Sequence, residues 1–118
     1  MQKEYELVRI FIGEGDKHGH LPLYEAIVLE ARSRGLAGAT VIRGIIGFGK
    51  NSKLCTTKVL CLSLDLPIIV EIIDESKKLA EFLPDLNKMI KQGLVTSEKV
   101  TVLISRHNGG SQKSEGTN

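Results

Sequence analysis

The chain has 118 residues, of which 42% are hydrophobic and 25% charged, as is typical of one soluble domain with a core of its own. Its net charge of +2 comes from 16 basic and 14 acidic residues that are interspersed, which argues against a dedicated nucleic-acid-binding protein. No apolar run approaches the roughly 20 residues of a membrane-spanning helix, and the acidic N-terminus does not resemble a signal peptide. We therefore expect a cytoplasmic protein.

An apolar run from Glu6 to Ile12, interrupted only by Arg9, predicts the first strand. Residues 13–20 contain three glycines and several charges, which indicate a polar loop. A helix is expected next, because Pro22 suits a first turn and Gly35 suits the left-handed position after a last turn. The apolar stripe of this helix is Tyr24, Ile27, Val28 and Ala31.

The second half of the chain repeats the pattern of strands and a helix. A second strand is predicted over Ala39 to Ile46, a third over Leu66 to Ile73 and a fourth over Val100 to Ser105. The helix expected between the last two strands has its apolar stripe at Leu79, Phe82, Leu83, Leu86 and Ile90. We therefore predict one domain over residues 1–107, followed by a flexible tail over residues 108–118.

The βαββαβ order predicts an α+β fold, the ferredoxin-like split-βαβ sandwich. Right-handed crossovers give an antiparallel sheet in the order 4-1-3-2, with both helices on one face and a long loop between strands 2 and 3. In this topology the exit of strand 1, the connection between strands 2 and 3 and the approach to strand 4 meet at one end of the sheet. Residues 16–18, 47–50 and 92–95 are therefore expected to form a binding edge.

The sheet face opposite the helices is expected to be covered by another subunit. A sheet covered on one side alternates apolar and polar residues, whereas the third strand is apolar on both faces. Because the chain has no third layer, we expect a homo-oligomer that packs its sheets together. Arg9, Arg43 and Glu71 interrupt the apolar strands, and we expect an ion pair of Glu71 with an arginine at this interface. A ligand contact is the alternative.

Three glycines, at positions 44, 47 and 49, stand at the end of the second strand and just after it. Two reasons could account for glycine at these positions: the backbone needs a positive φ, or it lies close to a neighbour or a ligand. The next connection is basic through Lys50 and two further lysines, which suits phosphate recognition or a solvated mobile loop. Phe48 suits stacking on a base or a partner, or packing back onto its own subunit. We expect ligand binding at Gly47-Phe48-Gly49-Lys50.

The remaining polar motifs do not indicate an enzyme. No catalytic triad can be assembled, and paired carboxylates at the expected binding edge are only a weak signal. The Gly-x-Gly at 13–15 lacks the third glycine of a dinucleotide-binding loop. Lys17, beside the first turn of a helix, could hold an anion, or the segment could be a hydrophilic turn. His18 and His20 lie near Asp16, but a metal ion would need more ligands, and we expect no metal site.

The two cysteines, Cys55 and Cys61, are separated by five residues and do not form a CxxC motif. The three histidines do not stand at zinc-ligand spacing from them. We expect plain thiols, as in a reducing compartment, and a disulfide across a hairpin is the alternative.

Two motifs of the second strand resemble the PII nitrogen-regulatory signal-transduction superfamily. Gly38-Ala39-Thr40-Val41 is similar to its Gly-x-Thr-Val, and Gly47-Phe48-Gly49-Lys50 is similar to the Gly-Phe-Gly-Arg at the base of its T-loop. From Arg9 to about Ser105 the chain more closely resembles an uncharacterised PII-like family, a domain of unknown function common in archaea and bacteria. The segments that carry this second resemblance are residues 9–14, 16–18, 43–49 and 62–71.

The resemblance implies a trimer that binds an adenine nucleotide (ATP, ADP or AMP) between subunits and signals through a mobile loop. It implies that Thr40 faces the adenine, that residues 47–50 line the cleft and that Arg106 approaches the phosphates. It also implies a membrane channel or transporter as partner, here a fluoride-export channel. We expect a non-enzymatic regulator of this type. The alternatives are a structural trimer without a ligand and, less favoured, an enzyme with a site between subunits.

Overall fold

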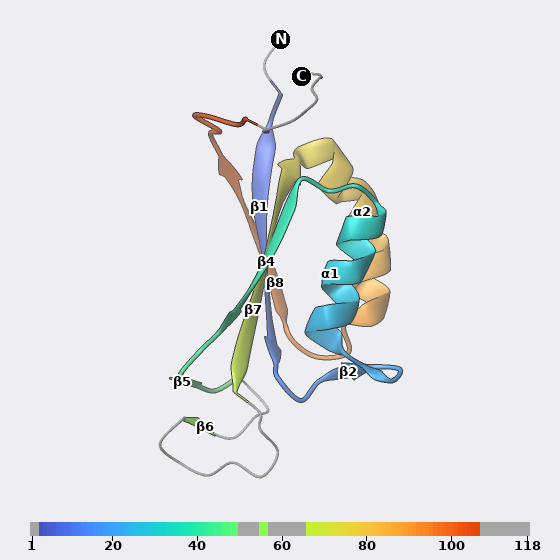
Figure 1. Ribbon diagram of the computed structural model, residues 1–118, viewed down its shortest axis with the longest axis vertical. Coiled ribbons are helices and arrows are strands. Elements are labelled where there is room, and N and C mark those ends of the chain that lie inside the picture. The colour runs from blue at the N-terminus through green and yellow to red at the C-terminus, as the bar shows by residue number, and fades with distance from the viewer. Residues whose placement is uncertain (1–2, 50–54, 57–65, 107–118) are drawn as a thin grey trace.

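The computed structural model describes residues 3–49, 55–56 and 66–106 (Figure 1). The long elements are β1 (Tyr5–Gly13), α1 (Leu23–Ser33), β4 (Gly38–Arg43), β7 (Pro67–Glu75), α2 (Ser76–Met89) and β8 (Leu94–Val100). Short strands that the sequence does not predict lie in the connections: β2 (Lys17–His18), β3 (Leu21–Pro22), β5 (Ile46–Gly47) and β6 (Cys55–Thr56). β2 pairs with β3, and β5 pairs with β6. The predicted tail from residue 108 onward lies outside the described residues.

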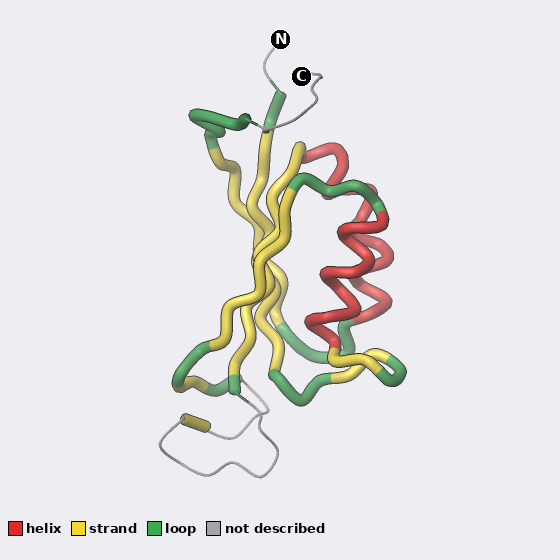
Figure 2. The backbone as a smooth tube through the Cα atoms, viewed as in Figure 1, coloured by secondary structure: helices red, strands yellow, loops and turns green. Residues whose placement is uncertain are grey.

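The four long strands form one antiparallel sheet in the order β4-β7-β1-β8. Along the chain β1, β4, β7 and β8 are the first to fourth long strands, so the order read from β8 is the predicted 4-1-3-2. Both helices cover the same face of the sheet, as Figure 2 shows in red and yellow. The predicted α+β, ferredoxin-like fold is therefore confirmed.

The core lies between this sheet face and the two helices. Successive side chains of a strand point to opposite faces, and in the two central strands every second residue is buried. The buried core residues of the two strands are Val8, Ile10, Ile12, Ile68, Val70 and Ile72, and those of the helices are Leu23, Ile27, Ala31, Leu79, Phe82 and Leu86. Full burial of one such large apolar side chain contributes about 1.5–3 kcal/mol. Neither helix of the described chain is long and apolar enough to cross a membrane.

The fourth strand differs from its prediction. The structure places β8 at Leu94–Val100 and leaves residues 101–106 outside any strand, so the predicted strand from Val100 to Ser105 is wrong. The reason is the length of β1, whose first residue Tyr5 already pairs with Val100. The apolar residues after Val100 have no strand beside them in the described chain with which they could pair. They are Val102, Leu103 and Ile104, with exposed fractions of 38, 88 and 70%.

The second strand ends earlier than predicted. The predicted run from Ala39 to Ile46 is divided into β4, which ends at Arg43, and the short β5. Gly44 lies between them and donates its N–H to the Pro67 carbonyl at 2.7 Å. A Cβ atom at Gly44 would lie 2.8 Å from Cγ of Pro67. Of the two reasons considered for this glycine, close approach to a neighbour is therefore the correct one.

Asp74 is the one buried charged residue of the described chain. Its Oδ2 accepts the Ala37 N–H at 2.9 Å and its Oδ1 accepts the Glu75 N–H at 2.6 Å. Asp74 therefore joins the α1–β4 connection to the junction of β7 and α2. Gly35, with a φ of 73°, follows α1 in the left-handed conformation that the sequence predicts.

Candidate functional site

Three connections meet at one end of the sheet (Figure 1). The register places Gly13 opposite Pro67, Arg43 opposite Ile68 and Leu94 opposite Phe11. The loop after β1, the turn after β4 and the turn before β8 therefore begin or end at the same level of the sheet. Asp16, Lys17, His18, Gly47, Phe48, Gly49 and Gln92 lie in or beside these connections. Leu94 and Val95 belong to β8 rather than to the loop, and Lys50 lies outside the described residues.

Two predicted ligand residues lie elsewhere. Thr40 is exposed in the middle of the edge strand β4, opposite Glu71. Arg106 follows β8, whose last residue Val100 pairs with Tyr5 at the start of β1. The segment after β8, orange to red in Figure 1, therefore lies at the end of the sheet opposite to β5. A single chain does not bring Arg106 close to Gly47.

The turn from β4 to β5 packs on Pro67. A Cβ atom at Gly44 or at Gly47 would lie 2.8 or 3.0 Å from Cγ of this proline. The residues beside these glycines are highly exposed, with 71% for Ile45 and 75% for Phe48. The turn thus rests on Pro67 and presents apolar side chains outward.

The loop after β1 is tied to its neighbours by polar contacts. Arg43 Nη2 lies 2.7 Å from Glu14 Oε2, and the Glu14 N–H donates to the Leu66 carbonyl at 2.8 Å. Asp16 Oδ2 accepts the Gly13 N–H at 3.0 Å. Within one chain, Arg43 therefore pairs with Glu14 and not with Glu71. Its position at a subunit interface stays a prediction.

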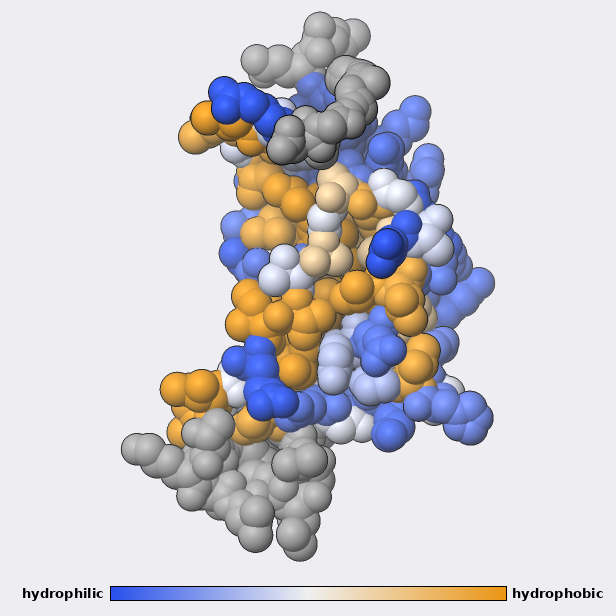
Figure 3. Space-filling view, viewed as in Figure 1, coloured by the Kyte–Doolittle hydropathy of each residue, from blue (hydrophilic) through white to orange (hydrophobic). Residues whose placement is uncertain are grey.

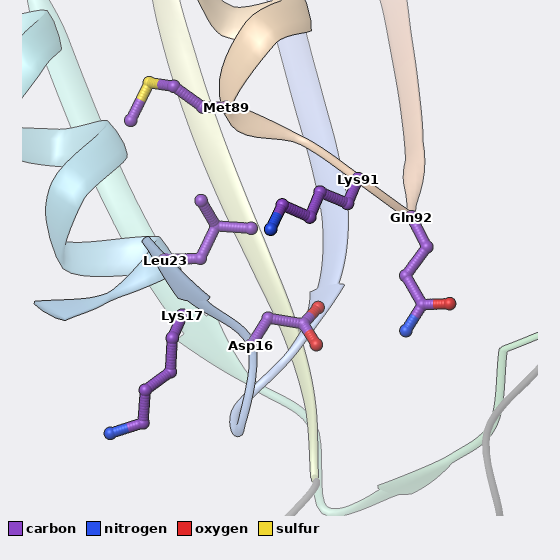
Figure 4. Close-up of a pocket in the computed structure, with 6 residues that line it drawn as sticks. All are labelled: Asp16, Lys17, Leu23, Met89, Lys91 and Gln92. Carbon is purple, nitrogen blue, oxygen red and sulfur yellow. The ribbon is translucent and has the colours of Figure 1, made fainter. Parts of the chain in front are cut away.

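A pocket of about 200 Å³ lies between the loop that leads to α1 and the turn between α2 and β8 (Figure 4). It is lined by Asp16, Lys17, Leu23, Met89, Lys91 and Gln92. In Figure 4 the Lys91 side chain extends from its turn toward Leu23 and Asp16, whereas the Lys17 side chain extends away from them. The sequence singles out Asp16, Lys17 and Gln92 for this region, but it does not identify Leu23, Met89 or Lys91. His18 is exposed and does not line the pocket.

Gly93 fixes the turn that carries Lys91 and Gln92. Its φ is 148°, and a Cβ atom there would lie 2.8 Å from the Phe11 carbonyl oxygen. A glycine is required because this turn crosses the β1 backbone at close range. The position of Lys91 beside the end of β1 therefore follows from Gly93.

The sheet face opposite the helices carries an ion cluster. Arg9 Nε lies 3.0 Å from Glu71 Oε2 on β7, and Arg9 Nη1 lies 3.1 Å from Glu98 Oε1 on β8. The hydrogen bonds from Arg9 to Glu71 and then to Glu98 raise the pKa of Arg9 above its usual value. The expected pairing of Glu71 with an arginine thus occurs within one chain. The sequence does not single out Glu98, because only the sheet register places it beside Arg9.

The same face is largely apolar. Residues of β1 and β7 whose side chains alternate with the buried core residues are only partly buried there. They include Leu7, Phe11, Ile69 and Ile73. Figure 3 shows apolar residues gathered along the sheet, near β5 and in the segment after β8. Nothing in the described chain covers this face.

The remaining chemical features are a possible metal site, which can be checked in the described residues, and the two cysteines, which cannot. Across residues 3–49, 55–56 and 66–106, no group of three or more His, Cys, Asp and Glu side chains is placed to hold a metal ion. The prediction for Cys55 and Cys61 concerns side chains outside the described part of the molecule.

Comparisons with known proteins agree with the fold. The family described as "DUF190: Uncharacterized ACR, COG1993" matches residues 5–102. A UPF0166 protein of Aquifex aeolicus (strain VF5) is 41% identical over 98 residues, which are 83% of this chain and 92% of that protein.

Two solved structures share the fold at low identity. CPII from Thiomonas intermedia K12, bound to ADP and bicarbonate, has a TM-score of 0.58 and 14% identity, with 84% of this chain and 88% of that chain covered. CutA1 from Shewanella sp. SIB1 has a TM-score of 0.51 and 9% identity, with 90 and 88% covered. Because the family match spans all the long elements and the Aquifex relative is 41% identical, the chain belongs to the DUF190 family of uncharacterised proteins.

Proposed function

We propose that the protein is a non-catalytic, cytoplasmic regulator that forms a PII-like homotrimer and binds a small anionic ligand between its subunits. An adenine nucleotide is the first candidate. The observation that carries the proposal is the apolar sheet face, which nothing in the described chain covers. Its burial against other copies would place the edges of neighbouring sheets side by side. Thr40 and Gly47 to Gly49 lie along such an edge.

The composition of this face suits burial in an oligomer. Its apolar side chains continue onto the edge strands, where Ile42 is 43% and Leu94 is 59% exposed. At roughly 25 cal/mol per Å² of apolar surface removed from water, covering such a face stabilises an assembly. Arg9 pairs with two carboxylates at the centre of the face, so a covering subunit would not bury an unpaired arginine.

The ligand site would need residues from two subunits. Phe48 is exposed beside the Gly47 turn and could stack on a base. Arg106 lies at the other end of its own sheet, so only the Arg106 of another copy could approach this turn. The structure of CPII bound to ADP and bicarbonate supports a nucleotide as ligand of this fold.

Signalling would use residues 50 to about 64, in the connection between β5 and β7. Gly44 and Gly47 rest on Pro67, so the two ends of this connection are held together. A ligand that binds one conformation of the connection more tightly than another shifts the population toward it. A membrane channel or transporter is the partner that we propose for this connection.

Calorimetry with ATP, ADP, AMP and cyclic nucleotides tests the ligand, and sedimentation velocity at micromolar concentration tests the trimer. We expect saturable heat from at least one nucleotide, and weaker binding in Phe48→Ala and Arg106→Ala. Arg32→Ala, an exposed arginine on the helical side, is the matched control and should bind as the native protein does. A trimer that gives no heat with any nucleotide would favour the ligand-free structural role. Product formation from a nucleotide would favour an enzyme.

A further inference from the structure

We propose that the homotrimer takes up protons when it assembles, on the sheet face opposite the helices (the open face), so that low pH favours assembly. The inference rests on the proposed trimer, but not on its ligand. It concerns the carboxylates of Glu71 and Glu98, which share one guanidinium, that of Arg9. In each subunit one of these two carboxylates therefore has no cation of its own.

The sheet register places this ion cluster on the open face. Directly opposite residues of paired antiparallel strands point to the same face. Arg9 lies opposite Glu71, and Glu98 lies opposite Leu7. Leu7 and Arg9 alternate with the buried core residues of β1, so their side chains point away from the helices.

The other residues of the open face do not compensate the excess carboxylate. Tyr5 of β1 adds a phenol, which is uncharged at neutral pH. Glu75 of β7 lies opposite Tyr5, and its Oε2 is 3.3 Å from Lys3 Nζ, so this pair is balanced. Apart from Glu98, the residues of β4 and β8 on this face are uncharged, namely Gly38, Thr40, Ile42, Leu94, Thr96 and Val100. In the part of the chain that the structure describes, two cations and three carboxylates thus give the face a net charge of −1.

Burial of the face makes this excess charge unfavourable. In a single chain water reaches the cluster, because 54% of the Glu98 side chain and 29% of the Glu71 side chain are exposed. Covering the face with other copies removes this water, and burial disfavours a carboxylate charge that has no cation of its own. The excess also adds up over three copies, and like charges repel more strongly where the dielectric constant is low. A proton on one carboxylate of each cluster removes the excess and leaves Arg9 paired with the other.

The direction of the pH effect follows from the number of bound protons. The trimer binds more protons than three separate subunits, so assembly is strongest at low pH and weakens as the pH rises. One proton per trimer changes the association constant by up to about tenfold per pH unit, and one per subunit by up to about a thousandfold.

Sedimentation equilibrium of the full chain between about pH 5 and pH 8, at constant ionic strength, tests the proposal. We expect the logarithm of the association constant to fall as the pH rises, with a slope of about −1 to −3. A trimer whose association constant is independent of pH, or rises with pH, would overturn this proposal and leave the trimer standing. A monomer at every pH would refute the trimer, and the proton uptake with it. The measurement needs no nucleotide, so its result is independent of ligand binding.

Single variants assign the pH effect to the cluster, because histidines also change charge in this pH range. Glu71→Gln and Glu98→Gln each leave Arg9 with one carboxylate. Each should strengthen assembly at neutral pH by about tenfold or more and flatten the slope. Glu81→Gln, at an exposed position of α2, is the matched control and should keep the native slope. A native slope in both cluster variants would refute the proposal.

The double variant Glu71→Gln with Glu98→Gln distinguishes charge balance from simple loss of contacts. It leaves Arg9 without a carboxylate, so the trimer should be weaker than in either single variant. If the carboxylates acted only as structural contacts, each single variant would already weaken the trimer, and that result would contradict the proposal. Circular dichroism of the variants should show that the subunit fold is kept.

Discussion

Arg9 and Glu71 face each other across β1 and β7, with Arg9 Nε 3.0 Å from Glu71 Oε2, on the sheet face that the helices leave open. Glu98 contacts the same guanidinium from β8. Arg9 therefore links the two central strands and one edge strand at the middle of an apolar surface. In a single chain this surface is in contact with water, whereas in the proposed oligomer it is buried.

Arg9→Ala should weaken the oligomer far more than it weakens the fold of the subunit. The ion pairs of Arg9 are partly exposed and such pairs contribute little net stability, so the free energy of unfolding of one subunit should change little. Burying two carboxylates without their arginine is strongly unfavourable, so sedimentation velocity should show dissociation at micromolar concentration. Lys99→Ala removes an exposed pair with Glu4 and should leave the association unchanged. An oligomer that survives Arg9→Ala would argue against burial of this face.

Asp74→Ala should lower the free energy of unfolding by about 1–3 kcal/mol, because it leaves the N–H groups of Ala37 and Glu75 without their acceptor. Asp74→Asn should cost less, since the amide oxygen can accept one of the two hydrogen bonds. Denaturation with urea measures both changes. Glu81→Ala, at an exposed position of α2, is the control and should stay within about 0.5 kcal/mol of the native chain.

Gly93→Ala should destabilise the protein more than Gly19→Ala. Both glycines have a positive φ, of 148° and 65°, and an alanine in the left-handed region costs roughly 1–2 kcal/mol. At Gly19 nothing lies within 4 Å of the added Cβ atom, whereas at Gly93 it meets the Phe11 carbonyl oxygen at 2.8 Å. Thermal unfolding of the two variants should therefore differ by several degrees. Equal melting temperatures would show that the turn before β8 can move away from β1 at little cost.

Local sequence patterns predict most of the fold. The apolar runs of β1 and β7 and the helical stripe of α1 are local patterns, and they predict these elements, whereas the alternating burial along β1 and β7 is set by the helices that cover one face. The end of β8 is set by Tyr5, the first residue of β1, which pairs with Val100. Residues 101–105 are as apolar as a strand, so only this long-range register excludes them from β8.

The candidate site was predicted less completely, because its parts are distant in sequence. The glycines near Phe48 are recognisable as unusual, but the structure explains Gly44 and Gly47 by their close approach to Pro67, about twenty residues further along the chain. Asp16 and Lys91 line one pocket although they are 75 positions apart. Lys91, which stands two residues before the turn glycine Gly93, has no local signal of this kind. The three lining residues that the sequence does not identify, Leu23, Met89 and Lys91, are therefore recognised only in the folded chain.

Gly44→Ala should be destabilising through one identifiable contact, which a second substitution can remove. The added Cβ atom would lie 2.8 Å from Cγ of Pro67 and 3.5 Å from its Cβ and carbonyl oxygen. Overpacking of this kind costs typically about 1–3 kcal/mol. Pro67→Ala deletes Cγ, so the double variant should recover part of the free energy of unfolding that Gly44→Ala loses. Denaturation of both single variants and the double variant gives their coupling energy, which should be at least about 0.5 kcal/mol for residues in contact. Strictly additive losses would mean that the β4–β5 turn does not rest on Pro67. The ends of the proposed signalling connection would then lack the support on which its function depends.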